Sequence, residues 1–196
     1  MFTDSHCHLN FPDFKDQMPA VLAAMRDAQV TRALCICTTL EEFDDVHALA
    51  LGHENLWATV GVHPDNEGVQ EPSLDDLLAR AALPRVVGIG ETGLDYYRLN
   101  GRSVAEMAWQ RERYRCHIRA ARQTGLPLVI HTRSASDDTL AILREEGGIG
   151  SATAARGVFH CFTENAEVAR AALDLGFYIS FSGILTFKSA ARSEER

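Results

Sequence analysis

The chain has 196 residues, of which 46% are hydrophobic and 23% are charged, so we expect one globular domain over residues 1–196 with a sizeable core. Its formal net charge of −8 argues against a protein that coats nucleic acid through a broad basic surface, because such binding needs many lysine and arginine contacts to phosphate. An enzyme that binds one or two phosphates through metal ions is not excluded.

The sequence also indicates the cellular compartment in which we expect the protein. No segment approaches the roughly 20 apolar residues that a membrane span needs, and the start Met1-Phe2-Thr3-Asp4 lacks the regions of a secretory signal. The five cysteines form neither an even disulfide framework nor the paired C-x-x-C spacing of a structural zinc site. We therefore expect reduced thiols and a soluble cytoplasmic protein.

Short apolar runs bounded by turn residues predict strands along the whole chain. In order, these runs are Phe2 to His8, Ala33 to Thr38, Trp57 to His63, Val86 to Glu91, Pro127 to Thr132, Gly157 to Cys161 and Phe177 to Ser182. Stretches with helical character lie between them. The sequence therefore predicts alternating strands and helices.

Several of these helices carry end signals. Ser73 with Asp76 three residues later predicts a helix start, and Thr163 is placed to cap a helix from Glu164 to Leu175 that ends at Gly176.

The longest helix is predicted from Val104 to Thr124, with Gly125 at its end and Pro127 just beyond. One face of it carries the apolar residues Met107, Tyr114, Ile118 and Ala121.

Strands that alternate with helices and read as continuous apolar runs, such as Ala33 to Cys37, predict a parallel sheet covered by helices. The sheet could be an open, doubly wound one or a closed barrel. No G-x-G-x-x-G follows a strand, and Gly88-Ile89-Gly90 lacks the third glycine, so nothing favours a dinucleotide site.

The polar residues at the strand ends favour the barrel. Most of the predicted strands carry an imidazole or carboxylate at or near the carboxyl end: His6, His8, His63, Glu91, His131 and His160. Taken singly, each is an ordinary polar end of a buried strand. Because the carboxyl ends of all strands in a β/α barrel meet at one mouth, their joint placement predicts a common site.

Nitrogen and oxygen ligands of this kind suit divalent cations. His6 and His8, two residues apart in an extended strand, face the same side and can bind one ion. The carboxylate of Glu91 can bridge two ions, which an imidazole cannot. Two divalent ions such as Mg²⁺, Mn²⁺ or Zn²⁺, about 4 Å apart, would stabilise the attacking and leaving oxygens of a phosphate ester, so hydrolysis is the expected reaction.

Five segments match known motifs in order: Asp4-Ser5-His6-Cys7-His8-Leu9, Gly61-Val62-His63-Pro64, Gly90-Glu91-Thr92-Gly93-Leu94-Asp95-Tyr96, Pro127-Leu128-Val129-Ile130-His131 and His160-Cys161-Phe162. They resemble the TatD family of metal-dependent deoxyribonucleases, up to about Phe187. The resemblance implies a TIM barrel of the amidohydrolase kind, divalent metals, and nuclease activity on DNA ends or damaged DNA.

The resemblance also implies residue roles. His6 and His8 would hold one metal, Glu91 would be the bridging and catalytic ligand, and His131 with His160 would hold the second metal. His63 would contact the substrate phosphate, although a structural turn role before Pro64 is an equal alternative. Asp95 and Tyr96 would line the substrate or orient ligands.

The sequence departs from the family after the seventh strand. Barrels of this class usually have about 250 residues, and the segment Ser189 to Arg196 is a polar tail without an apolar run. The family's eighth strand, with an aspartate that completes the first metal site, has no counterpart. We therefore expect a barrel truncated after strand seven, with open edges that favour self-association.

The leading hypothesis is a metal-dependent deoxyribonuclease, most simply an exonuclease, with DNA as its substrate. The same ligands would also serve a hydrolase of small esters or amides, because fold does not fix substrate. The non-enzymatic alternative is a metal-binding form that is inactive without its last strand.

Overall fold

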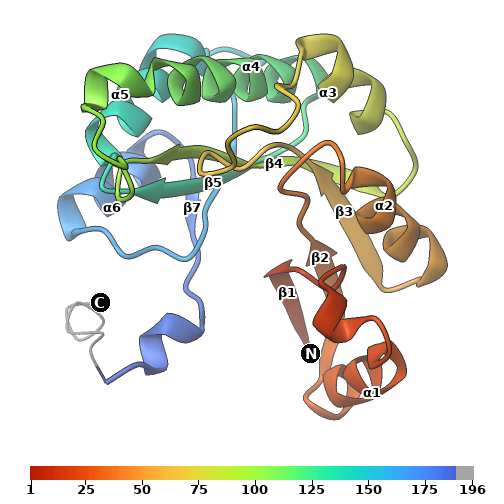
Figure 1. The fold of residues 1–196 in the computed structure, drawn as a ribbon. Coiled ribbons are helices and arrows are strands. Elements are labelled where there is room, and N and C mark those ends of the chain that lie inside the picture. The colour runs from red at the N-terminus through yellow and green to blue at the C-terminus, as the bar shows by residue number, and fades with distance from the viewer. Residues whose placement is uncertain (189–196) are drawn as a thin grey trace.

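A single sheet of seven parallel strands forms the centre of the protein, and the computed structural model describes residues 1–188. The strands pair in the order in which they occur in the chain. They are β1 (Phe2–Cys7), β2 (Val30–Cys35), β3 (Leu56–Val60), β4 (Val86–Asp95), β5 (Leu128–Arg133), β6 (Gly157–Phe159) and β7 (Tyr178–Ile179). Figure 1 shows that the sheet curls into an arch.

One α-helix connects each strand to the next: α1 (Met18–Asp27), α2 (Phe43–Gly52), α3 (Leu74–Ala81), α4 (Ala108–Thr124), α5 (Ser136–Glu146) and α6 (Ala166–Asp174). Short 3-10 turns span Pro12–Phe14, Val104–Met107 and Gly183–Thr186. The helices lie along the outside of the arch (Figure 1), as parallel crossover connections require. None of the helices in residues 1–188 is long and apolar enough to cross a membrane.

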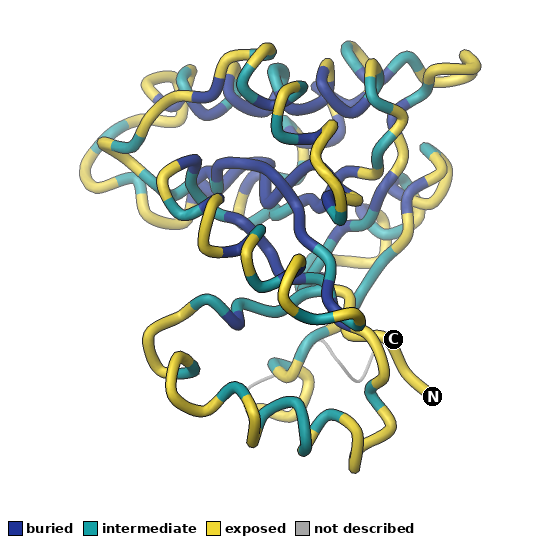
Figure 2. Tube along the Cα trace, turned by 90° about the vertical axis from the view of Figure 1, so that its right-hand side faces the viewer, coloured by how far each residue is buried: buried dark blue, intermediate teal, exposed yellow. Residues whose placement is uncertain are grey.

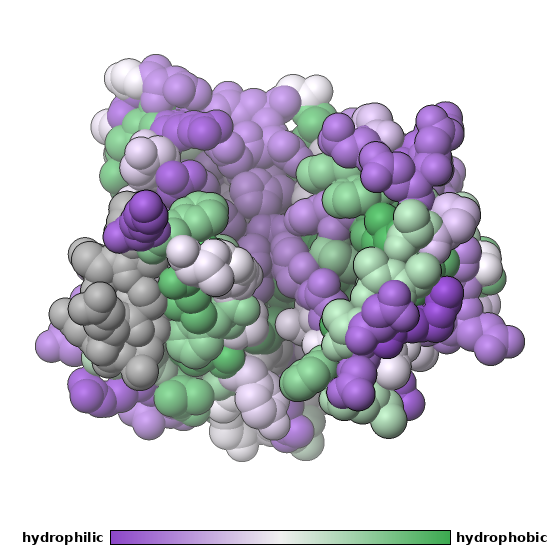
Figure 3. Space-filling view, turned by 90° about the horizontal axis from the view of Figure 1, so that it is seen from below, coloured by the Kyte–Doolittle hydropathy of each residue, from purple (hydrophilic) through white to green (hydrophobic). Residues whose placement is uncertain are grey.

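This architecture is a half-barrel of β/α units, and it confirms the predicted fold class and all seven strands. Within residues 1–188, no strand pairs with the outer edge of β1 or β7. Figure 3 looks into the open side of the arch and shows a hollow with hydrophilic groups at its base and apolar patches on both flanks. The predicted polar tail, Ser189 to Arg196, lies outside the described residues.

The core lies between the central strands and their helices. Every residue of β4 except Val87 is buried, as expected for a parallel strand covered on both faces. In α4, Tyr114 and Ile118 are fully buried against the sheet. The N-terminal part is more exposed, because α1 has no buried residue. Figure 2 shows this contrast.

Helix ends follow the sequence signals in two cases and not in the third. Ser73 and Asp76 form the predicted capping box at α3, and Gly125 ends α4 with φ +74°. The prediction that Thr163 caps α6 is wrong, because the side chain of Asn165 accepts a hydrogen bond from the Val168 amide. Asparagine is a better cap than threonine, and the helix starts where that bond forms.

Strand bounds differ from the prediction where pairing decides them. The β2 strand begins at Val30, opposite Phe2 in β1, and β7 is only Tyr178–Ile179. Glu91 was expected at the end of its strand. Instead β4 continues to Asp95, because its last residues pair with β5.

Candidate metal centre

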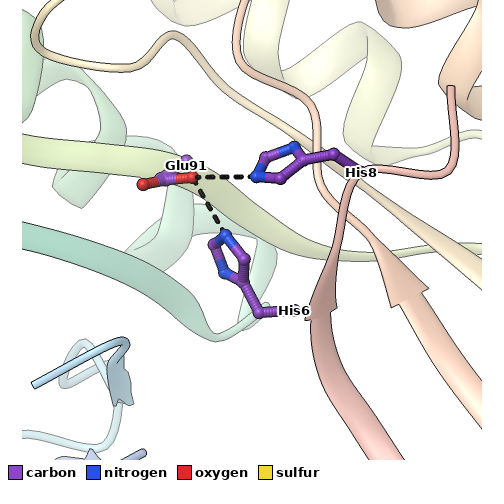
Figure 4. A group of neighbouring side chains, drawn as sticks. All are labelled: His6, His8 and Glu91. Atoms are coloured by element: carbon purple, nitrogen blue, oxygen red, sulfur yellow. Dashed lines mark ion pairs between the residues drawn. The ribbon is translucent and has the colours of Figure 1, made fainter. Parts of the chain in front are cut away.

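A buried carboxylate, Glu91, lies in the middle of the predicted histidines. One of its oxygens, Oε2, lies 3.2 Å from Nε2 of His6 and 4.0 Å from Nε2 of His8. Figure 4 shows both imidazoles, one on β1 and one just after it, pointing at this oxygen. The donor atoms of the three residues lie within 4.8 Å of one another, which is close enough to hold one ion.

The other oxygen of Glu91, Oε1, faces a second group of imidazoles. It lies 3.3 Å from Nε2 of His63, 3.4 Å from Nδ1 of His131 and 2.7 Å from Nε2 of His160. The donor atoms of His63, Glu91 and His131 also lie within 4.8 Å of one another. The carboxylate therefore divides the histidines into two groups, one at each oxygen.

Backbone contacts fix the position of Glu91. Its amide donates a hydrogen bond of 2.7 Å to the carbonyl of Cys37. The preceding residue, Gly90, packs directly against Gly61, where a Cβ atom would lie 2.5 Å from the Gly90 carbonyl carbon. Two glycines thus let the end of β3 and the middle of β4 approach closely enough to place the carboxylate among the imidazoles.

The charge of Glu91 is set by these neighbours. Burial by itself would raise the pKa of its carboxyl, since only 3% of the residue is exposed. Hydrogen bonding to the surrounding imidazoles, His131 foremost, outweighs burial and holds the pKa well below its usual range. Glu91 is therefore an anion at neutral pH.

His131 is oriented by a second carboxylate. Its Nε2 lies 3.0 Å from Oδ2 of Asp95, and Oδ1 of Asp95 accepts a hydrogen bond of 2.8 Å from the Tyr97 amide. Burial lowers the pKa of His131, but its bonds to Asp95 and Glu91 outweigh burial and raise it to about 9. Asp95 thus holds the ring so that Nδ1 faces Glu91.

Three buried ring nitrogens, Nδ1 of His6, His8 and His160, have no hydrogen-bond partner within residues 1–188. The His160 ring stacks on that of His6, with centroids 3.9 Å apart. Burial lowers the pKa values of His8 and His160, which keeps both rings neutral and their lone pairs available. Unpartnered buried nitrogens around an anion fit divalent cations, which would give them a partner.

His63 lies on a loop after β3 that α4 holds from behind. The Arg113 guanidinium donates to the carbonyls of His63 and Asn66, at 2.7 and 2.9 Å. His117, fully buried, accepts a hydrogen bond of 3.0 Å from the Val62 amide. Sequence reasoning missed these two residues, although polar side chains four apart on the apolar face of a helix were a visible signal.

The structure therefore brings all six predicted site residues to one place. Their roles as ligands remain predictions, including the pairing of His160 with His131. Among the described residues, neither group of potential metal ligands contains an aspartate.

The sequence matches a known family over nearly its whole length. The family of TatD related DNases matches residues 3–196. The metal-dependent hydrolase YcfH of Escherichia coli is 43% identical over 191 residues, which are 95% of this chain and 68% of that protein. The metal-dependent hydrolase YabD of Bacillus subtilis is 34% identical, over 100% of this chain and 74% of that protein.

Solved structures of TatD proteins share the fold. The crystal structure of YjjV, a TatD homologue from Escherichia coli, superimposes with a TM-score of 0.84 at 26% identity, over 99% of this chain and 73% of that one. A TatD family hydrolase from Entamoeba histolytica gives a TM-score of 0.79 at 25% identity, over 100% and 69%. The chain therefore belongs to the TatD related DNase family and is one of its metal-dependent hydrolases.

Proposed function

We propose that the protein hydrolyses phosphodiester bonds in DNA, as an exonuclease, with two divalent ions such as Mg²⁺, Mn²⁺ or Zn²⁺. The observation that supports this most is the division of the histidines between the two oxygens of Glu91. When bound, two ions stabilise the charge on the attacking and leaving oxygens of a phosphate ester. Family membership supports DNA as the substrate.

The ligand roles follow from which nitrogen of each ring is free. In our proposal, His6 and His8 hold one ion with Oε2 of Glu91. His131 donates its Nε2 proton to Asp95, so a cation that replaces the Nδ1 proton, which faces Oε1 of Glu91, would be bound by the lone pair of Nδ1. His160, 2.7 Å from the same oxygen, completes that second site.

His63 suits a different role. Its Nδ1 accepts a hydrogen bond of 3.0 Å from the Asp65 amide, so in the neutral ring the proton is on Nε2. That nitrogen points into the site as a donor, 3.3 Å from Glu91. A donor suits a phosphate oxygen and not a cation, which supports the proposal that His63 binds the substrate phosphate.

The test compares substrates on the metal-loaded chain. Single-stranded DNA oligonucleotides labelled at either end are incubated with Mg²⁺, Mn²⁺ or Zn²⁺, beside a panel of lactones and amides. We expect stepwise shortening of DNA from one end and no turnover of the panel. Turnover of the panel alone would favour the small-ester or amide hydrolase. Metal binding without cleavage of any substrate would favour an inactive metal-binding form.

We further propose that residues 1–196 form one cytoplasmic domain that self-associates through the strand edges. The five cysteines are all free, as in a reducing compartment. The edge residues Phe2 and Tyr178 are 63% and 76% exposed, and unpaired edges seek a partner strand. Sedimentation at increasing protein concentration tests this, and a monomer throughout would contradict it.

A further inference from the structure

An exposed aromatic ring lies at the carboxyl end of β4, beside the metal centre. Tyr97 is 60% exposed, and the Arg133 guanidinium lies over its ring, 3.6 Å from the centroid. The cation stacks on one face of the ring. The large remaining exposed area leaves the ring open to a second planar group.

This pair is tied directly to the proposed second ion site. The Tyr97 amide donates to Asp95, whose other oxygen holds His131. Arg133 is two residues from His131 in β5, so the two side chains leave the strand on the same face. Their spacing along the strand is about 7 Å. A DNA strand that has one phosphate at the metal centre would therefore place its next nucleotide at Tyr97 and Arg133.

The charge of Arg133 is available for a ligand. Arg102, Arg113 and Arg119 are each ion-paired to a glutamate. Arg133, in contrast, forms no ion pair with any residue of the described chain, although it is close enough to Asp95 to help lower the pKa of that carboxyl. The protein has a net charge of −8, so a guanidinium without an ion-pair partner in the described chain, at the edge of the site, would attract an anion.

We infer that Tyr97 and Arg133 form a binding site for the nucleotide next to the cleaved bond, an inference that rests on the proposed function. The exposed face of Tyr97 stacks on the base, which is sequence-tolerant because every base has a π face. The Arg133 guanidinium binds the phosphate of the same nucleotide.

The experiment measures binding and not turnover. Cleavage-resistant, phosphorothioate-linked oligothymidine carrying a fluorophore is titrated with the Mg²⁺-loaded chain, and anisotropy gives the Kd. A second oligonucleotide of equal length, with abasic residues in place of thymidine, keeps the phosphates and removes the bases. Tyr97→Ala should weaken binding of oligothymidine by about 5-fold to 100-fold, and leave binding of the abasic strand unchanged.

Arg133→Ala should weaken binding of both strands and reduce the slope of log Kd against log salt by about one. Tyr97→Phe should bind like the unchanged chain, since it keeps the ring. The controls are Leu173→Ala, which removes an exposed apolar side chain of α6, and Arg26→Ala, which removes an exposed arginine of α1. Neither control should alter either Kd.

Three results would each overturn the inference. Tyr97→Ala could weaken binding of oligothymidine and of the abasic oligonucleotide equally, it could leave both affinities unchanged, or the unchanged chain could fail to bind oligothymidine. A separate assay follows hydrolysis of a small phosphodiester, bis(4-nitrophenyl) phosphate, which does not reach the pair. If that diester is cleaved and Tyr97→Ala binds DNA normally, the inference fails and phosphodiester hydrolysis stands. If neither the diester nor DNA is cleaved, the proposed function fails.

Discussion

The two sides of Glu91 are supported to very different degrees. At Oε1, Asp95 fixes the far nitrogen of His131, and α4 holds the loop of His63. At Oε2, the far nitrogens of His6 and His8 have no hydrogen-bond partner within residues 1–188, and most of β1 is exposed. A ligand whose far nitrogen is bonded keeps its orientation without the metal. The Oε1 side is therefore preorganised, while the Oε2 side depends on the ion itself for order.

The largest effect is expected from the residue that joins the two sides. Glu91→Gln keeps the shape of the side chain but removes the anion between two groups of imidazoles. We expect hydrolysis of single-stranded DNA to fall by far more than the roughly 10-fold to 100-fold typical of residues behind the ligands. Single-turnover rates at saturating metal measure this. A rate near that of the unchanged chain would place the reaction elsewhere.

The next effect separates the sides by metal content. His6→Ala combined with His8→Ala should remove one bound ion, whereas His131→Ala should weaken the other, because each change removes lone pairs at only one oxygen of Glu91. Isothermal titration with Mn²⁺ gives the stoichiometry and both affinities. We expect the Oε2 side to bind more weakly in the unchanged chain. The same stoichiometry in both variants would contradict the ligand assignment.

A smaller effect should follow from loosening the preorganised side. Asp95→Asn removes the charge that orients His131 and should weaken the ion at Oε1 by about 10-fold to 100-fold, leaving the ion at Oε2 unchanged. The same Mn²⁺ titration measures it, with Asp76→Asn on the exposed start of α3 as control. Equal weakening of both ions would mean that the two sides are not independent.

The contact of α4 with the His63 loop should influence the metal centre least, and its effect is on stability. Burial lowers the pKa of His117 to about 4 from an ordinary 6.5, so the unfolded chain binds a proton that the folded chain does not. Stability should therefore fall as the pH drops from 6.5 towards 4, by up to about 3 kcal/mol from this residue.

His117→Gln removes that titration and should flatten the pH dependence of the free energy of unfolding. Urea denaturation at about pH 7 and about pH 5 measures the difference. The control is His53→Gln, in the turn between α2 and β3. An unchanged slope in His117→Gln would show that the histidine is not held neutral.

The sequence predicted the parts of this molecule that depend on local order. His6, His131 and His160 could be placed because each belongs to the end of an apolar run, and parallel strands bring such ends together. The roles of Arg113 and His117 could not, because they depend on backbone atoms some fifty positions earlier in the chain.

The predicted ends of strands and helices were wrong for a related reason. The extension of β4 beyond Glu91 depends on pairing with β5, and a single strand's residues do not reveal how far its neighbour runs. The cap of α6 was predicted at Thr163 and lies at Asn165. Both residue types can cap a helix, and the path of the chain in the folded protein selects one.

The contact between Gly61 and Gly90 leaves the metal centre little room for structural change. Two main chains meet there without any side chain between them, so no rotamer change can absorb an error. Even a methyl group at position 61 would push β4 away at the residue before Glu91, and functional geometry is lost by shifts of about 0.5 Å. The position of Glu91 relative to the loop of His63 is therefore set by main chain alone, and the absence of a side chain at Gly61 is a requirement of the metal centre.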